Sequence, residues 1–243
     1  MHADHAGLIE LLRRAARPDP GERHDHAAYT GSDHPFHNVS TPDRRAIARR
    51  WLAAQKGAPG EAILAMVDSL FAGASHEEKT LAPLILGYAP SARRAARPDD
   101  LYRWLGELHG WAEVDSLCQN TFTAADMLAD WPAWRGLIER LSRDPDINRR
   151  RASLVLLTSP VRTSDDPRFR DLAFVMIDRL KGERPILITK AVSWLLRSMV
   201  GRHPDAVDRY LKDNAASLPK IAMRETRVKL ETGTKSGRGQ RRP

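Results

Sequence analysis

The stretch TPDRRAIARRWLAAQ, residues 41–55, shows the type of secondary structure that recurs along the chain. Thr41 is placed to cap a helix, Pro42 suits the first helical position, and Asp43 brings an acid to the first turn. The stretch therefore predicts a helix that runs through Trp51.

Segments with the same helical character fill most of the chain, and short connections rich in Pro, Gly, Asp and Ser separate them. No alternating run of β-branched residues between tight-turn dipeptides indicates a strand. Besides residues 41–55, we expect helices over residues 5–16, 60–73, 76–89, 98–108, 113–128, 131–142, 147–158, 166–182, 185–201, 204–214 and 217–230. Short loops make successive helices antiparallel neighbours. The pattern predicts an all-α fold, an α-solenoid whose concave face holds an extended partner, with a compact bundle as the alternative.

The ends and one internal stretch differ in composition from the helical segments. Residues 17–40 are loop-rich, and we expect a single helical domain over residues 1–230. Residues 231–243 have the composition of a basic, disordered tail.

The 243 residues carry a formal net charge of +8, which is typical of proteins with a polyanionic partner. The last twenty residues hold seven Lys and Arg against two Glu, so much of the excess lies at the C-terminus. The single cysteine, Cys118, excludes an intramolecular disulfide framework and fits a reducing cytoplasm. No apolar run approaches the ~20 residues of a membrane span, and the N-terminus lacks the features of a signal peptide. We expect a cytoplasmic protein without a membrane anchor.

Asp115 follows Trp111 four positions later in the stretch GWAEVD. On a helix this spacing places an indole and a carboxylate on one face. The alternative is that Asp115 is an acid favoured near a helix start by the helix dipole. Trp194 lies in an otherwise buried helical pattern, with Lys190 four residues before it.

Three consecutive arginines, Arg149 to Arg151, stand at a predicted helix start, where the helix dipole disfavours them. A phosphate partner would relieve this placement, because an arginine fork matches phosphate oxygens. A solvated basic face offset by Asp144 and Asp146 is an equally good interpretation.

Histidines and the cysteine offer weaker alternatives. Histidines 24, 26, 34 and 37 lie in a polar, loop-like region without a metal-ligand motif, so we expect no metal and no cofactor. Cys118 has the apolar helical neighbours Val114 and Phe122, which favours a core thiol over a nucleophile.

Taken in order, several segments resemble the AlkD-like family of DNA alkylation repair glycosylases. They are Tyr29 with the stretch 39–45 (VSTPDRR), the stretch 111–115 (WAEVD), 149–154 (RRRASL), 188–197 (ITKAVSWLLR) and 224–227 (RETR). The resemblance spans about residues 25 to 230. It implies a HEAT-like solenoid with a concave basic face for duplex DNA, and excision of N3- and N7-alkylpurines without metal or cofactor.

The resemblance also implies roles for individual residues. Asp115 would be the catalytic carboxylate, and Trp111 and Trp194 would flank the deoxyribose of the lesion. Arg151 would grip a phosphate, with Arg150 as the alternative in register. Tyr29, Ser40 and Lys190 complete the expected DNA-binding set. Ser40 and Asn148 depart from the family pattern, which puts affinity and lesion preference in question more than the chemistry.

The expected partner is therefore double-stranded DNA that contains alkylated purines, bound by a monomer. An alkylated purine already carries positive charge, so its release needs little acid catalysis, while a carboxylate stabilises the cationic sugar. Two other functions stay open. A non-catalytic solenoid would bind branched or distorted DNA, and a protein-binding scaffold would carry an apolar concave surface.

Overall fold

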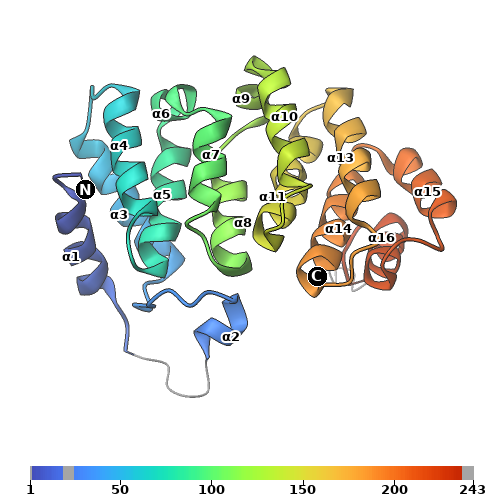
Figure 1. Ribbon diagram of the computed structural model, residues 1–243, viewed down its shortest axis with the longest axis horizontal. Helices are drawn as coiled ribbons and strands as arrows, with labels where there is room; N and C mark the ends of the chain where they lie inside the picture. Colours follow the sequence, from blue (N-terminus) through green and yellow to red (C-terminus); the bar gives the residue numbers. More distant parts are fainter. Residues whose placement is uncertain (1, 19–24, 237–243) are drawn as a thin grey trace, which may run out of the picture. The chain divides into compact units, whose positions relative to one another are not determined.

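The computed structural model describes residues 2–18 and 25–236, and within these ranges every regular element is a helix (Figure 1). The helices are α1 (His5–Ala15), α2 (His26–Thr30), α3 (Thr41–Ala54), α4 (Gly60–Phe71), α5 (His76–Tyr88), α6 (Pro90–Ala95), α7 (Pro98–Leu105), α8 (Gly110–Asn120), α9 (Ala124–Ala129), α10 (Trp131–Leu141), α11 (Ile147–Thr158), α12 (Pro160–Thr163), α13 (Pro167–Leu180), α14 (Ile186–Met199), α15 (Pro204–Asp213) and α16 (Lys220–Thr232). The predicted all-α class is confirmed.

The chain forms two compact units, Met1–Phe122 and Thr123–Pro243. In the first unit α5 packs against α3, α4, α6 and α8. In the second, α14 packs against α11, α13 and α16. Each unit thus has one central helix, α5 or α14, that packs against several neighbours, and helices of each unit lie side by side (Figure 1).

The central helix α5 buries polar as well as apolar side chains. Ser75 and Glu78 close a reciprocal capping box at its start, which satisfies backbone donors that a buried helix end would leave unpaired. The fully buried Glu77 accepts hydrogen bonds from the backbone nitrogens of His37 and Val39, at 2.9 and 3.2 Å. The polar start of α5 therefore fixes the chain segment that leads into α3.

The predicted helix over residues 113–128 is wrong in its bounds, because α8 and α9 divide it. Thr123 starts a new helix: its hydroxyl accepts from the backbone nitrogen of Asp126, whose side chain accepts from the backbone nitrogen of Thr123. This capping box starts a separate helix within the stretch predicted to be one. The short helices α2, α6 and α12 were not expected either.

Other bounds differ by small amounts. Ser40 caps α3, and Thr41, the predicted cap, is the first helical residue. At the other end α16 extends to Thr232, two residues into the stretch expected to be a tail, and Gly233 ends it in the left-handed conformation. Residues 237–243 of the predicted tail, and residues 19–24 of the predicted loop, lie outside the described residues.

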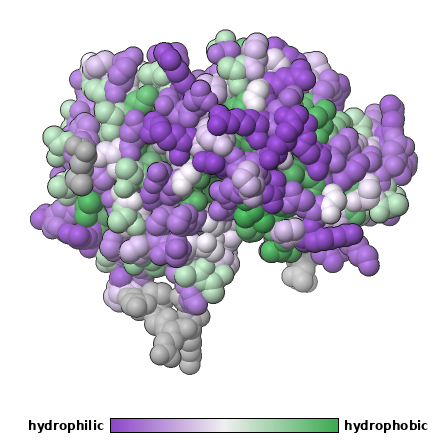
Figure 2. Space-filling view, viewed as in Figure 1, coloured by the Kyte–Doolittle hydropathy of each residue, from purple (hydrophilic) through white to green (hydrophobic). Residues whose placement is uncertain are grey.

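The described helices include none with the length and apolarity needed to cross a membrane. Hydrophilic residues dominate the face of the molecule in Figure 2, and hydrophobic residues show between them in small groups.

Candidate active site

Helix α8 carries Trp111 and Asp115 one turn apart, both half-exposed. Of the three residues between them, Glu113 and Val114 are fully buried. The helix therefore has one face in the core, while the indole and the carboxylate share the other. This is the arrangement that their spacing predicts.

Tyr29 lies beside Trp111. The Trp111 Nε1–H donates a 2.7 Å hydrogen bond to the backbone carbonyl of Tyr29, and the two rings meet edge to face with centroids 5.4 Å apart. Tyr29 sits on α2, and 66% of its surface is exposed, which is unusual for a large aromatic residue. Two residues that sequence reasoning selected separately thus form one aromatic pair.

Gly110 explains how α2 can approach α8 so closely. Its φ is +70°, and a Cβ on it would lie 2.2 Å from the carbonyl oxygen of Thr30 and 2.5 Å from the carbonyl carbon of Gly31. Only glycine fits both the left-handed backbone and the contact. The Gly-Trp pair at the start of α8 is therefore a docking point for α2.

Glu113 holds the segment after α2 against α8, and sequence reasoning missed it. Its carboxylate accepts from the Ser32 hydroxyl at 2.6 Å, from Nδ1 of His34 and His76 at 3.0 Å each, and from the backbone nitrogen of His109 at 2.8 Å. One buried side chain thus joins the loop, α5 and the start of α8. The available signal was an acid in a first helical turn, which is too common to stand out.

Burial by itself would raise the pKa of Glu113. Hydrogen bonds from His76, Ser32, the backbone of His109 and His34 outweigh burial and hold that pKa below its ordinary value. Glu113 is therefore ionised at neutral pH, and its carboxylate is bound by hydrogen-bond donors inside the protein.

In the second unit, α14 carries a row of partly exposed side chains: Lys190, Trp194 and Arg197. Lys190 is exposed, and the other two are half-buried. Spacings of four and three residues place all three on one face of the helix. The site prediction included Lys190 and Trp194 but not Arg197, which the spacing alone would have added.

Arg151 is buried, and its Nη1 donates a 2.6 Å hydrogen bond to the carbonyl oxygen of Leu187 in the first turn of α14. Arg150 pairs with Glu183, with Nε 2.9 Å from Oε1. Arg149 lies 3.4 Å from Asp144. Two of the three arginines therefore have acidic partners within the chain, and the third bridges α11 to α14.

Ser40 is the N-cap residue of α3, and this role fixes its side chain. Its hydroxyl accepts from the backbone nitrogen of Asp43 at 3.3 Å and donates to the Asp43 carboxylate at 2.5 Å. Cys118 is buried, as expected for a core thiol.

The histidines weighed as metal ligands have structural contacts. His24 lies outside the described residues, and His26 stacks on Phe36 with centroids 3.5 Å apart. His34 bonds to Glu113, and the backbone nitrogen of His37 bonds to Glu77.

The predicted site residues are divided between the two units. Tyr29, Ser40, Trp111 and Asp115 belong to the first unit, and Arg150, Arg151, Lys190 and Trp194 belong to the second. Within the first, the structure brings Tyr29, Trp111 and Asp115 together on α2 and α8.

The fold and the sequence of the chain are both similar to those of known proteins. A solved structure, "Predicted DNA alkylation repair enzyme from Enterococcus faecalis", has the same helical-repeat fold, with a TM-score of 0.64. It is 18% identical, and the match covers 82% of this chain and 90% of that one. The family model for DNA alkylation repair enzymes matches residues 9–230, so the chain belongs to that family. No curated protein matches the chain.

Proposed function

We propose that the protein is a DNA glycosylase that hydrolyses the N-glycosidic bond of cationic N3- and N7-alkylated purines in duplex DNA. Membership of the DNA alkylation repair enzyme family supports a role in alkylation repair. The observation that carries the finer proposal is the pairing of Trp111 and Asp115 on the partly exposed face of α8, with Tyr29 beside Trp111.

The chemistry suits a site with a carboxylate and aromatic faces. Alkylation at N3 or N7 makes the purine cationic, so the base leaves as a neutral molecule and takes the bonding electrons with it. Positive charge then develops on the deoxyribose. Asp115 would stabilise that charge and accept a proton from the water that attacks C1′. The reaction needs no metal or redox cofactor.

The indole of Trp111 would add to this stabilisation. A cation over an indole face gains roughly 0.5–2 kcal/mol, depending on how much water is excluded. The hydrogen bond to the Tyr29 carbonyl and the edge-to-face contact restrict the indole before a substrate arrives. A group held in place in advance costs little reorganisation during the reaction.

The row on α14, in the second unit, would contact DNA on its own account. Trp194 would offer an aromatic face there, with the exposed Lys190 beside it, whereas Arg197 already pairs with Glu225 at 3.3 Å. Cations that neutralise phosphates release condensed counterions, so binding should weaken as salt rises. Arg151 would act on the same helix by fixing its first turn. We further propose that the protein acts as a monomer in the cytoplasm.

Base release from a defined duplex tests the proposal. The purified protein is incubated with an oligonucleotide duplex that contains one 7-methylguanine, and the free base is measured by chromatography. We expect release of 7-methylguanine and none of guanine from the unmodified duplex. A lesion with an uncharged base should be a much poorer substrate, because its departure needs a proton donor and the proposed mechanism uses Asp115 as a carboxylate.

The alternative function is that of a non-catalytic protein for branched or distorted DNA. It predicts salt-sensitive duplex binding without release of any base. That result in the same assay would replace the glycosylase proposal.

A further inference from the structure

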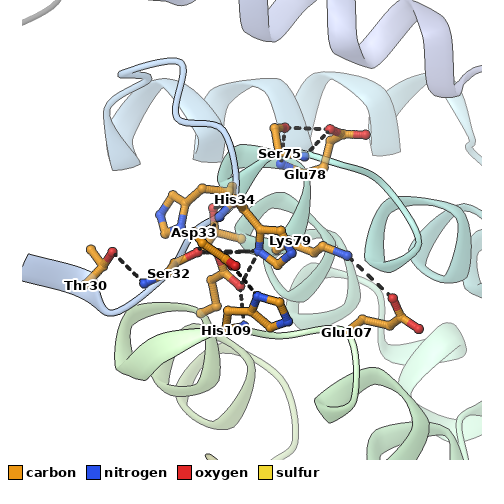
Figure 3. A network of polar contacts seen from close by, with 12 residues as sticks. Thr30, Ser32, Asp33, His34, Ser75, Glu78, Lys79, Glu107 and His109 are labelled. Carbon is orange, nitrogen blue, oxygen red and sulfur yellow. Dashed lines mark hydrogen bonds and ion pairs between the residues drawn. The ribbon is translucent and has the colours of Figure 1, made fainter. Parts of the chain in front are cut away.

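Asp33, His34 and His109 form a cluster of metal-ligating side chains in the first unit. Each offers one ligand atom, and these atoms all lie within 4.8 Å of one another. Asp33 and His34 belong to the segment between α2 and α3, while His109 is the residue before α8. Figure 3 shows Asp33 and His34 facing His109 across the gap between these two segments.

A carboxylate orients His34 as it would a metal ligand. Nδ1 of His34 lies 3.0 and 3.1 Å from the two oxygens of Glu113, which can only accept, so Nδ1 carries the hydrogen. The other nitrogen, Nε2, is left with a lone pair for a cation. Histidines that bind metals in proteins regularly donate their second nitrogen to a carboxylate in this way.

His109 and Asp33 supply the other two ligands. Nδ1 of His109 contacts a carboxylate oxygen of Asp33, and the imidazole rings of His34 and His109 lie nearly parallel, 15° apart, with centroids 4.4 Å apart. The Asp33 side chain is 81% exposed and that of His109 is 47% exposed, so both can turn toward a shared ion and an ion can reach them. A rotation of the His109 ring is needed, since nearly parallel rings do not point at one centre.

We propose that Asp33, His34 and His109 bind one zinc ion, with water completing its coordination. Two imidazoles and one carboxylate, with a water in the fourth position, form a donor set that zinc is known to bind. Bonds of about 2.0–2.2 Å in a tetrahedral arrangement place ligand atoms roughly 3.3 Å apart, so ligand atoms that now lie up to 4.8 Å apart must move closer around the ion. One zinc would also offset the negative charges of Asp33 and the nearby Glu113.

The site would have a structural role. Zinc would tie the segment that follows α2 to the start of α8, and this segment continues directly from the helix that carries Tyr29. The ion would reinforce the hydrogen bonds that Glu113 already makes between the same two segments. Zinc binding is independent of the proposed base excision and can be measured without it.

Metal binding by the full-length, untagged chain tests the inference. After dialysis against a chelator, the protein is titrated with zinc by calorimetry, and with cobalt as a coloured probe that zinc displaces. We expect one equivalent at micromolar affinity or tighter. His109→Gln and Asp33→Asn should each weaken binding at least about tenfold, which is the smallest loss expected when a group of a metal site is removed. The matched control His37→Gln, in the same segment, should bind as the wild type does.

Thermal unfolding gives a second measurement. Zinc should raise the unfolding temperature of the wild type and of His37→Gln, and it should not raise that of His109→Gln. Circular dichroism verifies that each variant is folded before titration. Failure of the wild type to bind one equivalent, or equal binding by all variants, would overturn the proposal. Neither result bears on base release.

Discussion

The indole nitrogen of Trp111 donates its hydrogen to the backbone carbonyl of Tyr29, 2.7 Å away and 82 residues earlier in the chain. This bond crosses from α8 to α2, and the two rings add an edge-to-face contact. The orientation of Trp111, and with it one wall of the candidate site, therefore depends on whether α2 is docked.

Replacing Asp115 with Asn keeps the shape of the side chain and removes its charge. We expect release of 7-methylguanine to fall on the order of 100- to 1000-fold, as for other preorganised charge-stabilising groups. Affinity for the duplex should change little, because the carboxylate does not attract phosphates. Asp213→Asn, at the exposed end of α15, is the matched control and should be fully active. Full activity of Asp115→Asn would remove the carboxylate from the mechanism.

Trp111→Phe keeps an aromatic ring but deletes the donor to the Tyr29 carbonyl. The loss of one hydrogen bond corresponds to about 1 kcal/mol, which loosens α2 locally. Amide hydrogen exchange in residues 26–31 should become faster, and base release should fall severalfold. Trp131→Phe alters an indole that meets Phe169 in the second unit and should leave that exchange unchanged. Identical exchange in wild type and Trp111→Phe would show that the bond does not hold α2.

Gly110→Ala tests the docking point between α2 and α8. The variant must adopt a positive φ and also displace the Thr30 carbonyl, so we expect a loss of at least about 2 kcal/mol in the free energy of unfolding. Gly136→Ala is the control, because a Cβ there meets nothing within 4 Å and the residue lies inside α10. That variant should gain roughly 0.5–1 kcal/mol. Chemical denaturation measures the free energy of unfolding of both variants. A change of the same sign in the two variants would contradict the prediction.

Lys190→Ala and Arg151→Ala separate phosphate binding from helix packing. Lys190 is exposed, so its removal should weaken duplex binding and lower the slope of log affinity against log salt by about one, without a change in stability. Arg151 is buried and donates to the Leu187 carbonyl. Arg151→Ala should therefore weaken duplex binding and, unlike Lys190→Ala, lower the free energy of unfolding by roughly 1–3 kcal/mol. An unchanged salt slope in Lys190→Ala would place that lysine outside the interface.

Glu78→Gln tests a pH dependence of stability. Burial would raise the pKa of Glu78, but hydrogen bonds from Ser75 and His5 outweigh it and hold that pKa below its ordinary 4.5. A lowered pKa stabilises the fold above pH 4.5, and this stabilisation is lost as pH falls through the folded pKa. The variant should be less stable than the wild type at pH 7, by roughly 1–3 kcal/mol. The difference should shrink below pH 4.5 in urea denaturation, and a constant difference would contradict the assignment.

The helical class and the pairing of Trp111 with Asp115 could be predicted because both depend on local spacing. The contact of Tyr29 with Trp111 could not be derived from the residues, since it joins segments far apart in sequence through a glycine contact. The role of Glu113 was missed for the same reason: its partners come from three separate segments. The break before Thr123 was missed although the sequence carries its signal, a threonine followed three residues later by an acid that forms a capping box.

Glu113 and Asp115 stand two residues apart on α8, yet they would face different limits on mutation. Glu113 has two oxygens for donors from four residues, so a glutamine there would bring an amide against donors and an alanine would leave them buried and unpaired. Asp115 lies on the partly exposed face. A distant relative that had lost catalytic activity would therefore keep a glutamate at the position of Glu113, while the residue at the position of Asp115 would be free to vary.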